Sequence, residues 1–99
     1  MAITVRVIDG RVEEYENGKH KRSYGSNGGG KVNCASTDGT LVAVVDEKGY
    51  ITERIDGKLQ RTYGGRDVVG VQVSDGVVIA QKKNGSTEEY VDGRRIRCY

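Results

Sequence analysis

The chain has 99 residues and carries 16 Lys and Arg against 14 Asp and Glu, which gives a net charge of +2. This near-balance provides no general attraction to nucleic acid or membranes, and no apolar run reaches the roughly 18 residues of a membrane span. Hydrophobic residues make up 35% of the chain, with six Tyr but no Phe, Trp or Pro. Because this apolar inventory is modest for a small domain, we expect part of the burial to come from association with another copy.

The first residues, Met-Ala-Ile-Thr-Val-Arg, lack the basic and then apolar plan of a secretory signal, so we expect a cytoplasmic protein. Cys34 and Cys98 match no metal or redox spacing, and we expect two reduced strand residues rather than a disulfide. His20 is the sole histidine and lies in a Lys-His-Lys-Arg run. We therefore expect no catalytic residue, no metal site and no cofactor.

A similar segment occurs three times, at residues 12–25, 51–64 and 87–99. Each copy contains an Asn-Gly or Asp-Gly pair followed by a tyrosine seven residues later. Successive pairs lie 39 and then 36 residues apart. Self-similarity at a fixed period is typical of repeat architectures.

A second pair of similar segments lies at 31–49 and 68–85, with Asp-Gly pairs at Asp38 and Asp75, 37 residues apart. Together the two patterns predict one all-β domain over residues 1–99. Its three repeat units span approximately 1–30, 31–66 and 67–99.

Each complete unit is predicted to contain four short antiparallel strands. In the middle unit they cover residues 31–37, 40–46, 50–55 and 58–63. Asn-Gly and Asp-Gly favour the two-residue type I′ hairpin, because both central residues need positive φ. The first ten residues align with the second strand of the other units, so the first unit lacks its first strand. Eleven strands and no helix are expected.

The middle unit carries three motifs at the turns and outer strand: Asp38-Gly39, Asp46…Gly49 and Gly57-Lys58…Arg61…Gly64. With them, residues 32–65 resemble one blade of a β-propeller of the tryptophan–aspartate repeat type. The sequence has no Trp-Asp or Gly-His pair, and its period is below the roughly 40–45 residues typical of those repeats. The resemblance implies propeller-like, four-stranded blades.

A propeller closes with about four to eight blades, which three units cannot supply. Two chains would supply six, so we expect a homo-oligomer and favour a dimer. The alternative fold is a β-trefoil, which closes with three four-stranded repeats in one chain. A third alternative is an open twisted meander that pairs its edges in an oligomer.

Residues 25–31, Gly-Ser-Asn-Gly-Gly-Gly-Lys, have the spacing of a phosphate-binding loop. Val32 stands where that motif has Ser or Thr for Mg²⁺, and a strand is predicted where it has a helix. We therefore interpret the segment as a loop between units. Since loops carry function more often than strands, the predicted binding residues are Ser26, Asn27 and Lys31 here, and Arg66 and Asp67 in the next such loop.

Arginine and tyrosine recur on the predicted outer strands, as Arg22 and Tyr24, Arg61 and Tyr63, and Arg97 and Tyr99. Such a surface suggests phosphate contacts with base stacking, or an aromatic platform for sugar rings. A hairpin register with two-residue turns favours cross-strand ion pairs instead, with Glu14 facing Lys21, Glu13 facing Arg22 and Glu88 facing Arg97. The tyrosines are then expected to pack between blades with the hydroxyl outward.

These patterns favour a non-catalytic module that binds another protein, as an adaptor or a small inhibitor-type protein does. The inference rests on fold-level analogy, because propellers present loops and a central mouth to partners. Carbohydrate recognition is the alternative and nucleic-acid binding ranks third.

Overall fold

The computed structural model describes residues 3–26 and 30–99, which form three antiparallel sheets. The first sheet contains β1 (Ile3–Ile8), β2 (Arg11–Glu16) and β3 (Lys19–Tyr24). The second contains β4 (Val32–Thr37), β5 (Leu41–Asp46), β6 (Ile51–Ile55) and β7 (Lys58–Tyr63). The third contains β8 (Val68–Ser74), β9 (Val77–Lys82), β10 (Thr87–Val91) and β11 (Arg94–Cys98). The described residues include no helix, and so none long and apolar enough to cross a membrane.

The all-β prediction is confirmed, with eleven strands grouped as three, four and four. The strands of the second sheet begin and end within one residue of the predicted bounds. Within each sheet the strands follow one another in chain order as a meander. Three separate sheets of this kind are propeller-like and do not form a trefoil.

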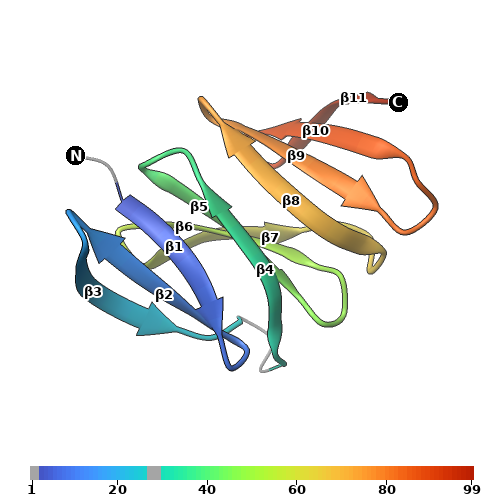
Figure 1. The fold of residues 1–99 in the computed structure, drawn as a ribbon. Coiled ribbons are helices and arrows are strands. Elements are labelled where there is room, and N and C mark those ends of the chain that lie inside the picture. The colour runs from blue at the N-terminus through green and yellow to red at the C-terminus, as the bar shows by residue number, and fades with distance from the viewer. Residues whose placement is uncertain (1–2, 27–29) are drawn as a thin grey trace.

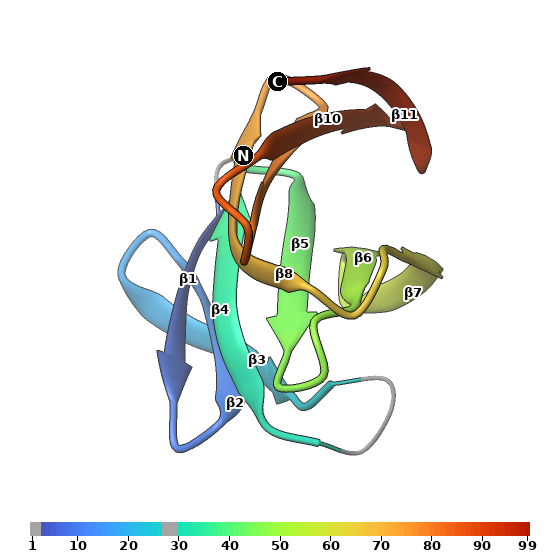
Figure 2. The same ribbon diagram turned by 90° about the vertical axis from the view of Figure 1, so that its right-hand side faces the viewer.

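The three sheets lie in a row, with the second sheet between the first and the third (Figure 1). The strands β1, β4 and β8 lie next to one another at the centre of this arrangement (Figures 1 and 2). The later strands of each sheet run outward from there, and β3, β7 and β11 form the periphery. The chain thus forms an arc of three blade-like sheets.

Local turn chemistry explains most of the hairpins. Five Asn-Gly or Asp-Gly pairs have a first residue with φ of 51–54° and a glycine with φ of 76–82°. These pairs begin at Asp9, Asn17, Asp56, Asp75 and Asp92. Asn and Asp tolerate this region and Gly favours it, which confirms the predicted type I′ turns.

The turn at Asp38 differs from the one at Asp75. The Asp38 carboxylate accepts the backbone N–H groups of Thr40 and Leu41, at 3.0 and 2.9 Å, which closes a longer connection. Val42 pairs with Thr37, and Val78 pairs with Val73, so equivalent strand positions are 36 residues apart. The match of Asp38-Gly39 with Asp75-Gly76, 37 apart, is therefore wrong by one residue.

The outer hairpin of every sheet contains a β-bulge that the expected register lacks. Glu14 pairs with Arg22 and not with Lys21, because one extra residue is inserted in β3. The same shift occurs between Glu53 and Arg54 and between Glu89 and Tyr90. The predicted pairs of Glu14 with Lys21, Glu13 with Arg22 and Glu88 with Arg97 are therefore wrong, since a bulge changes which residues share a face.

Two hydrophobic clusters fill the two gaps between neighbouring sheets. The first gap contains Ile3, Val12, Val32, Val42 and Val44. The second gap contains nine buried residues, namely Ala43, Val45, Ile51, Val68, Val71, Val73, Val78, Ala80 and Tyr90. β-branched residues dominate both clusters, as suits side chains packed on a pleated surface. The second sheet is buried on both of its faces.

Candidate functional site

The free edge of β1 distinguishes the first sheet from the other two in the described residues. β1 pairs with β2 on one side and ends its sheet on the other, whereas β4 and β8 occupy this inner position in the other sheets. Ile8 and Arg11 form the hydrogen-bonded pair next to the β1–β2 turn. Because hydrogen-bonded pairs alternate with non-hydrogen-bonded pairs along an antiparallel ladder, every second residue of β1 points its backbone N–H and C=O away from β2. These are Ile3, Val5 and Val7, and the N–H of Ile3 indeed donates to Gly39 O at 3.2 Å.

A hollow of about 410 Å³ lies beside this edge, between the start of β1 and the end of β4. Its lining residues are Ile3, Thr4, Val5, Ala35, Ser36, Thr37, Asp38 and Gly39. The other two sheets show which element occupies the equivalent position, namely an inner strand. In the second sheet the inner strand β4 pairs with β5 and packs against β8 of the next sheet. An equivalent strand of the first sheet would pair with β1 and pack against β4.

The strands that hold this position elsewhere define the chemistry that it accepts. Val32 of β4 and Val68 of β8 are buried, and each strand then has a bulge before its pairing resumes. Small polar groups meet the neighbouring sheet, since Ser36 Oγ accepts the Val73 N–H at 3.1 Å. A strand of β-branched and small residues therefore suits the edge of β1.

The first predicted binding loop borders a second hollow, of about 430 Å³. It contains two of the predicted residues, Ser26 and Lys31, whereas Asn27 lies outside the described residues. Ser26 Oγ donates to Gly30 O at 2.8 Å, which fixes the loop on itself. The remaining lining residues carry both charges and include Asp9, Arg11 and Glu47. The loop leads into the strand β4, so the helix that a phosphate-binding loop requires does not follow it.

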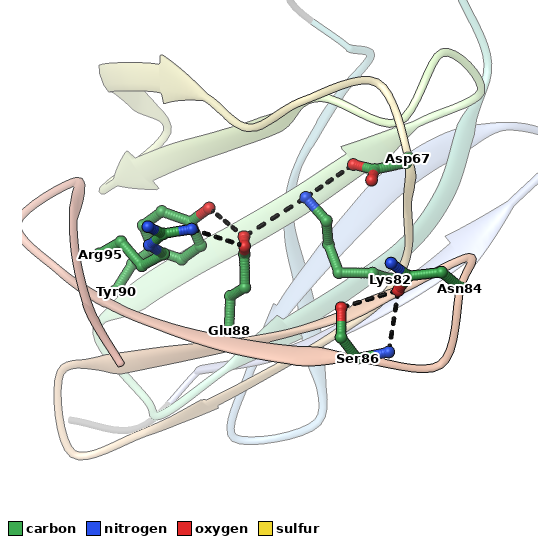
Figure 3. A network of polar contacts seen from close by, with 7 residues as sticks. All are labelled: Asp67, Lys82, Asn84, Ser86, Glu88, Tyr90 and Arg95. Atoms are coloured by element: carbon green, nitrogen blue, oxygen red, sulfur yellow. Dashed lines mark hydrogen bonds and ion pairs between the residues drawn. The ribbon is translucent and has the colours of Figure 1, made fainter. Parts of the chain in front are cut away.

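The second predicted loop is held by ion pairs. Arg66 is exposed with φ of 71°, whereas the Asp67 carboxylate lies 2.7 Å from Lys82 Nζ. Lys82 also contacts Glu88 at 3.3 Å, and Figure 3 shows the resulting network. Hydrogen bonding to Asp67 raises the pKa of Lys82. This part of the loop stabilises the third sheet.

Glu88 is the buried centre of that network. It accepts the Tyr90 hydroxyl at 2.5 Å and Arg95 Nη1 at 3.2 Å (Figure 3). The hydrogen bond from Tyr90 lowers the pKa of Glu88. Burial and the same bond raise the pKa of Tyr90 to about 12.

The predicted arginines and tyrosines form three equivalent clusters, which we call the Glu–Arg–Tyr triads. Their members are Glu14, Arg22 and Tyr24; Glu53, Arg61 and Tyr63; and Glu89, Arg97 and Tyr99. In each triad the tyrosine hydroxyl donates to the glutamate. The arginine contacts the same carboxylate at 3.0, 2.5 and 3.4 Å respectively. The β-bulge creates this arrangement by bringing Arg and Tyr onto the face of Glu.

The triads give the recurring tyrosines a structural role. Tyr24 and Tyr63 lie between sheets, as expected, but their hydroxyls point inward to Glu14 and Glu53 and not outward. Burial raises the pKa of both tyrosine hydroxyls above the usual range. Tyr99 alone of the three is largely exposed, so the described residues present no threefold aromatic platform.

Two signals of these sites were available in the sequence. Glutamate, arginine and tyrosine recur with identical spacing in all three units, eight residues from Glu to Arg and two more to Tyr. The arginines and tyrosines were predicted as a surface, but Glu14 was assigned to Lys21, so the binding of Arg and Tyr to one glutamate was missed. The missing first strand was recognised, yet the resulting edge of β1 was not named as a site.

Reactive groups are scattered over the part of the chain that the structure describes. No group of three His, Cys, Asp or Glu side chains there is arranged to hold a metal ion. His20 Nε2 lies 2.6 Å from Glu13 Oε1 and its ring packs edge-on against Tyr15. Cys34 and Cys98 are free, and burial raises the pKa of the Cys34 thiol, which disfavours the reactive thiolate.

Comparison with known families gives one assignment. The family model for the Helicobacter pylori IceA2 protein matches residues 1–63. The chain belongs to the IceA2 family. The IceA2 match ends at the last residue of β7, so it includes the first and second sheets in full. The comparison with curated proteins gives no match.

A solved structure shares the fold of this IceA2-family chain. A chain in the "Crystal Structure of Mitotic Checkpoint Complex" superposes with a TM-score of 0.77 at 14% sequence identity. The superposition covers 97% of the present chain and 34% of the other, so the present chain spans about a third of that length. At this identity the likeness establishes the propeller-like fold alone.

Proposed function

We propose that this protein is a non-catalytic protein-binding module that accepts an extended segment of a partner along β1. The observation that carries the proposal is the free inner edge of β1 beside a hollow, where both other sheets hold a fourth strand. Unpaired edges bind extended segments through backbone hydrogen bonds, and side-chain pockets then select among them.

The partner segment is expected to resemble β4 and β8. It runs antiparallel to β1, as β4 runs to β5. Every second side chain is β-branched or small, because the equivalent positions hold Val68, Val71 and Val73 in the third sheet. The hollow reaches Thr37 and Asp38, so a small polar residue fits at that end.

Two further features belong to the proposal. The repeats resemble those of tryptophan–aspartate propellers, whose surfaces present binding sites to proteins, and this analogy supports a protein partner.

Free Cys34 and Cys98 support a cytoplasmic location, where thiols stay reduced. Fractionation of cells that produce the tagged protein tests the location, and recovery outside the cytoplasm would contradict it.

Self-association is also proposed. Three sheets from one chain and three from a second copy give six, which lies within the usual range of closed propellers.

The strand-binding proposal is tested with a labelled peptide that carries the sequence of residues 67–76, the strand that fills the inner position in the third sheet. Fluorescence anisotropy measures its binding to the protein, with a scrambled peptide as the control. We expect saturable binding by the first peptide, and binding by the scrambled one weaker by about tenfold or more. Equal binding by the two peptides would contradict strand recognition.

A variant of β1 locates the binding. Val5→Pro removes an N–H group that points away from β2, so it leaves the hydrogen bonds between β1 and β2 in place. We expect Val5→Pro to retain the circular dichroism of the parent and to lose peptide binding. A folded Val5→Pro variant that binds as well as the parent would place the site elsewhere.

A further inference from the structure

The Glu–Arg–Tyr triads of the first and second sheets are each covered by the next sheet along the chain. Arg54 of β6 lies over the Tyr24 ring, 4.7 Å from its centre. Tyr90, the equivalent of Arg54 in β10, packs on Tyr63 with ring centres 4.8 Å apart. The two covering residues both follow the glutamate position of their own strand.

Glycine turns complete the two covers. The turn at Gly57 lies against Arg22, so close that a Cβ on this glycine would be 2.8 Å from Arg22 Cδ. The turn at Gly93 lies against Arg61 in the same way, with a corresponding distance of 2.6 Å. The same two-part contact therefore occurs at both gaps between sheets. In each, a side chain of the next sheet (Arg54 or Tyr90) packs on the triad tyrosine, and a glycine turn of that sheet packs on the triad arginine.

Among the described residues, no sheet covers the third triad. Tyr99 is 64% exposed. The Arg97 side chain is 65% exposed, against 28% for Arg22 and 37% for Arg61. This end of the row therefore presents one half of the repeated contact to solvent.

The first sheet carries the other half of the contact at the opposite end of the row (Figure 1). Tyr15 holds the position equivalent to Arg54 and Tyr90, since it directly follows Glu14. Gly18 holds the position equivalent to Gly57 and Gly93, and nothing lies within 4 Å of a Cβ placed on it. The first sheet is built to cover a triad, and no described residue of the chain supplies one.

We propose that a second copy of this chain occupies these faces in a head-to-tail dimer. Tyr15 of one copy packs on Tyr99 of the other, and the Gly18 turn lies against Arg97. Both ends of each copy are used, so two copies form a ring of six sheets with two identical junctions. The inference rests on the self-association proposed above and does not use strand binding at β1.

The two faces also indicate how strong the contact is. Thr4 and Arg6 of β1 replace the buried Val42 and Val44 of β5, and Gln81 and Thr87 replace Val45 and Ile51. Because these replacements reduce the apolar area, each junction is weaker than the gaps inside the chain. We expect reversible association with a dissociation constant of roughly 10 µM to 1 mM.

Sedimentation velocity over about 10 µM to 1 mM protein tests the dimer. We expect the mass of the parent to rise toward twice that of one chain. Tyr15→Ala and Tyr99→Ala should each weaken association by about tenfold or more. Leu59→Ala removes a 47% exposed side chain of the middle sheet and serves as the control with parental association. Circular dichroism confirms that the variants fold.

Mixing the two tyrosine variants separates a head-to-tail contact from other modes. Tyr15→Ala retains the third-sheet face and Tyr99→Ala retains the first-sheet face, so a mixture has one intact junction per pair. We expect the mixture to associate more strongly than either variant alone. A parent that stays monomeric would overturn self-association itself. A dimer unaffected by both variants, or assemblies larger than two chains, would overturn the proposed faces and ring.

Discussion

Glu53 shows how this small protein keeps a carboxylate in its interior. The side chain is 1% exposed, accepts the Tyr63 hydroxyl and contacts Arg61 at 2.5 Å. Burying a carboxylate without partners is costly, so the arginine and the tyrosine are what make this position tolerable. The same three residue types recur in each sheet, but only in the first and second does the next sheet cover them.

We expect Glu53→Gln to lower the free energy of unfolding by about 2 kcal/mol, because Arg61 loses its charge partner within the gap between sheets. Glu89→Gln is the matched control at the equivalent position. Its partner Arg97 is mostly exposed, so a loss below about 1 kcal/mol is expected. Urea unfolding measures both values. Equal losses would show that coverage by the next sheet does not matter.

Glu88 gives a pH dependence whose sign follows from its lowered pKa. Its contribution to stability is complete above the unfolded pKa of about 4.3 and is lost as the pH falls through the lower folded pKa. Glu88→Gln lacks this contribution. The stability difference between parent and variant should therefore be constant near neutral pH and shrink as the pH is lowered below about 4. A difference independent of pH would contradict the assigned network.

At the scale of strands and turns, two glycines show two separate reasons why a larger residue would be strained: a positive φ and the close approach of another backbone segment. Gly49 and Gly85 occupy equivalent turns with the same φ of 92°. A Cβ on Gly49 would lie 2.5 Å from the Arg66 carbonyl oxygen, whereas a Cβ on Gly85 would meet nothing within 4 Å. The two positions share the conformational requirement and differ in the close approach of backbone.

Gly85→Ala is expected to lower the free energy of unfolding by about 1 kcal/mol through its φ alone. Gly49→Ala should cost about 3 kcal/mol or more, because the backbone of the loop before β8 must also move. Thermal or urea unfolding of the pair provides the measurement. Similar losses for the two variants would mean that the loop yields freely.

The strands and most turns were predictable because their causes are local. Asn17, Asp56 and Asp92 precede glycines and adopt the positive φ that their turns require. The bulges were not predictable from the turns, since a two-residue turn fixes the pairing next to it and not the register beyond an inserted residue. The bulge in the first sheet is also why Glu14 was assigned to a cross-strand pair with Lys21 and not with Arg22.

At the scale of the whole molecule, the described residues form three sheets in a row with two unlike ends, and the first sheet has three strands where the others have four. The count of strands was readable from the repeat, because the first ten residues match a second strand. Which surfaces are left open could not be read in that way, since it depends on how the sheets face one another. The free edge of β1 and the open triad of the third sheet both follow from that arrangement.

The free edge of β1 is tested most directly by residue-resolved amide hydrogen exchange, with and without the peptide of residues 67–76. We expect the amides of Val5 and Val7 to exchange quickly in the protein alone. Those of Thr4 and Arg6, which face β2, should exchange slowly. Bound peptide should slow Val5 and Val7 selectively. Protection of Val5 and Val7 before peptide is added, or unchanged exchange once it is bound, would contradict an open strand-accepting edge.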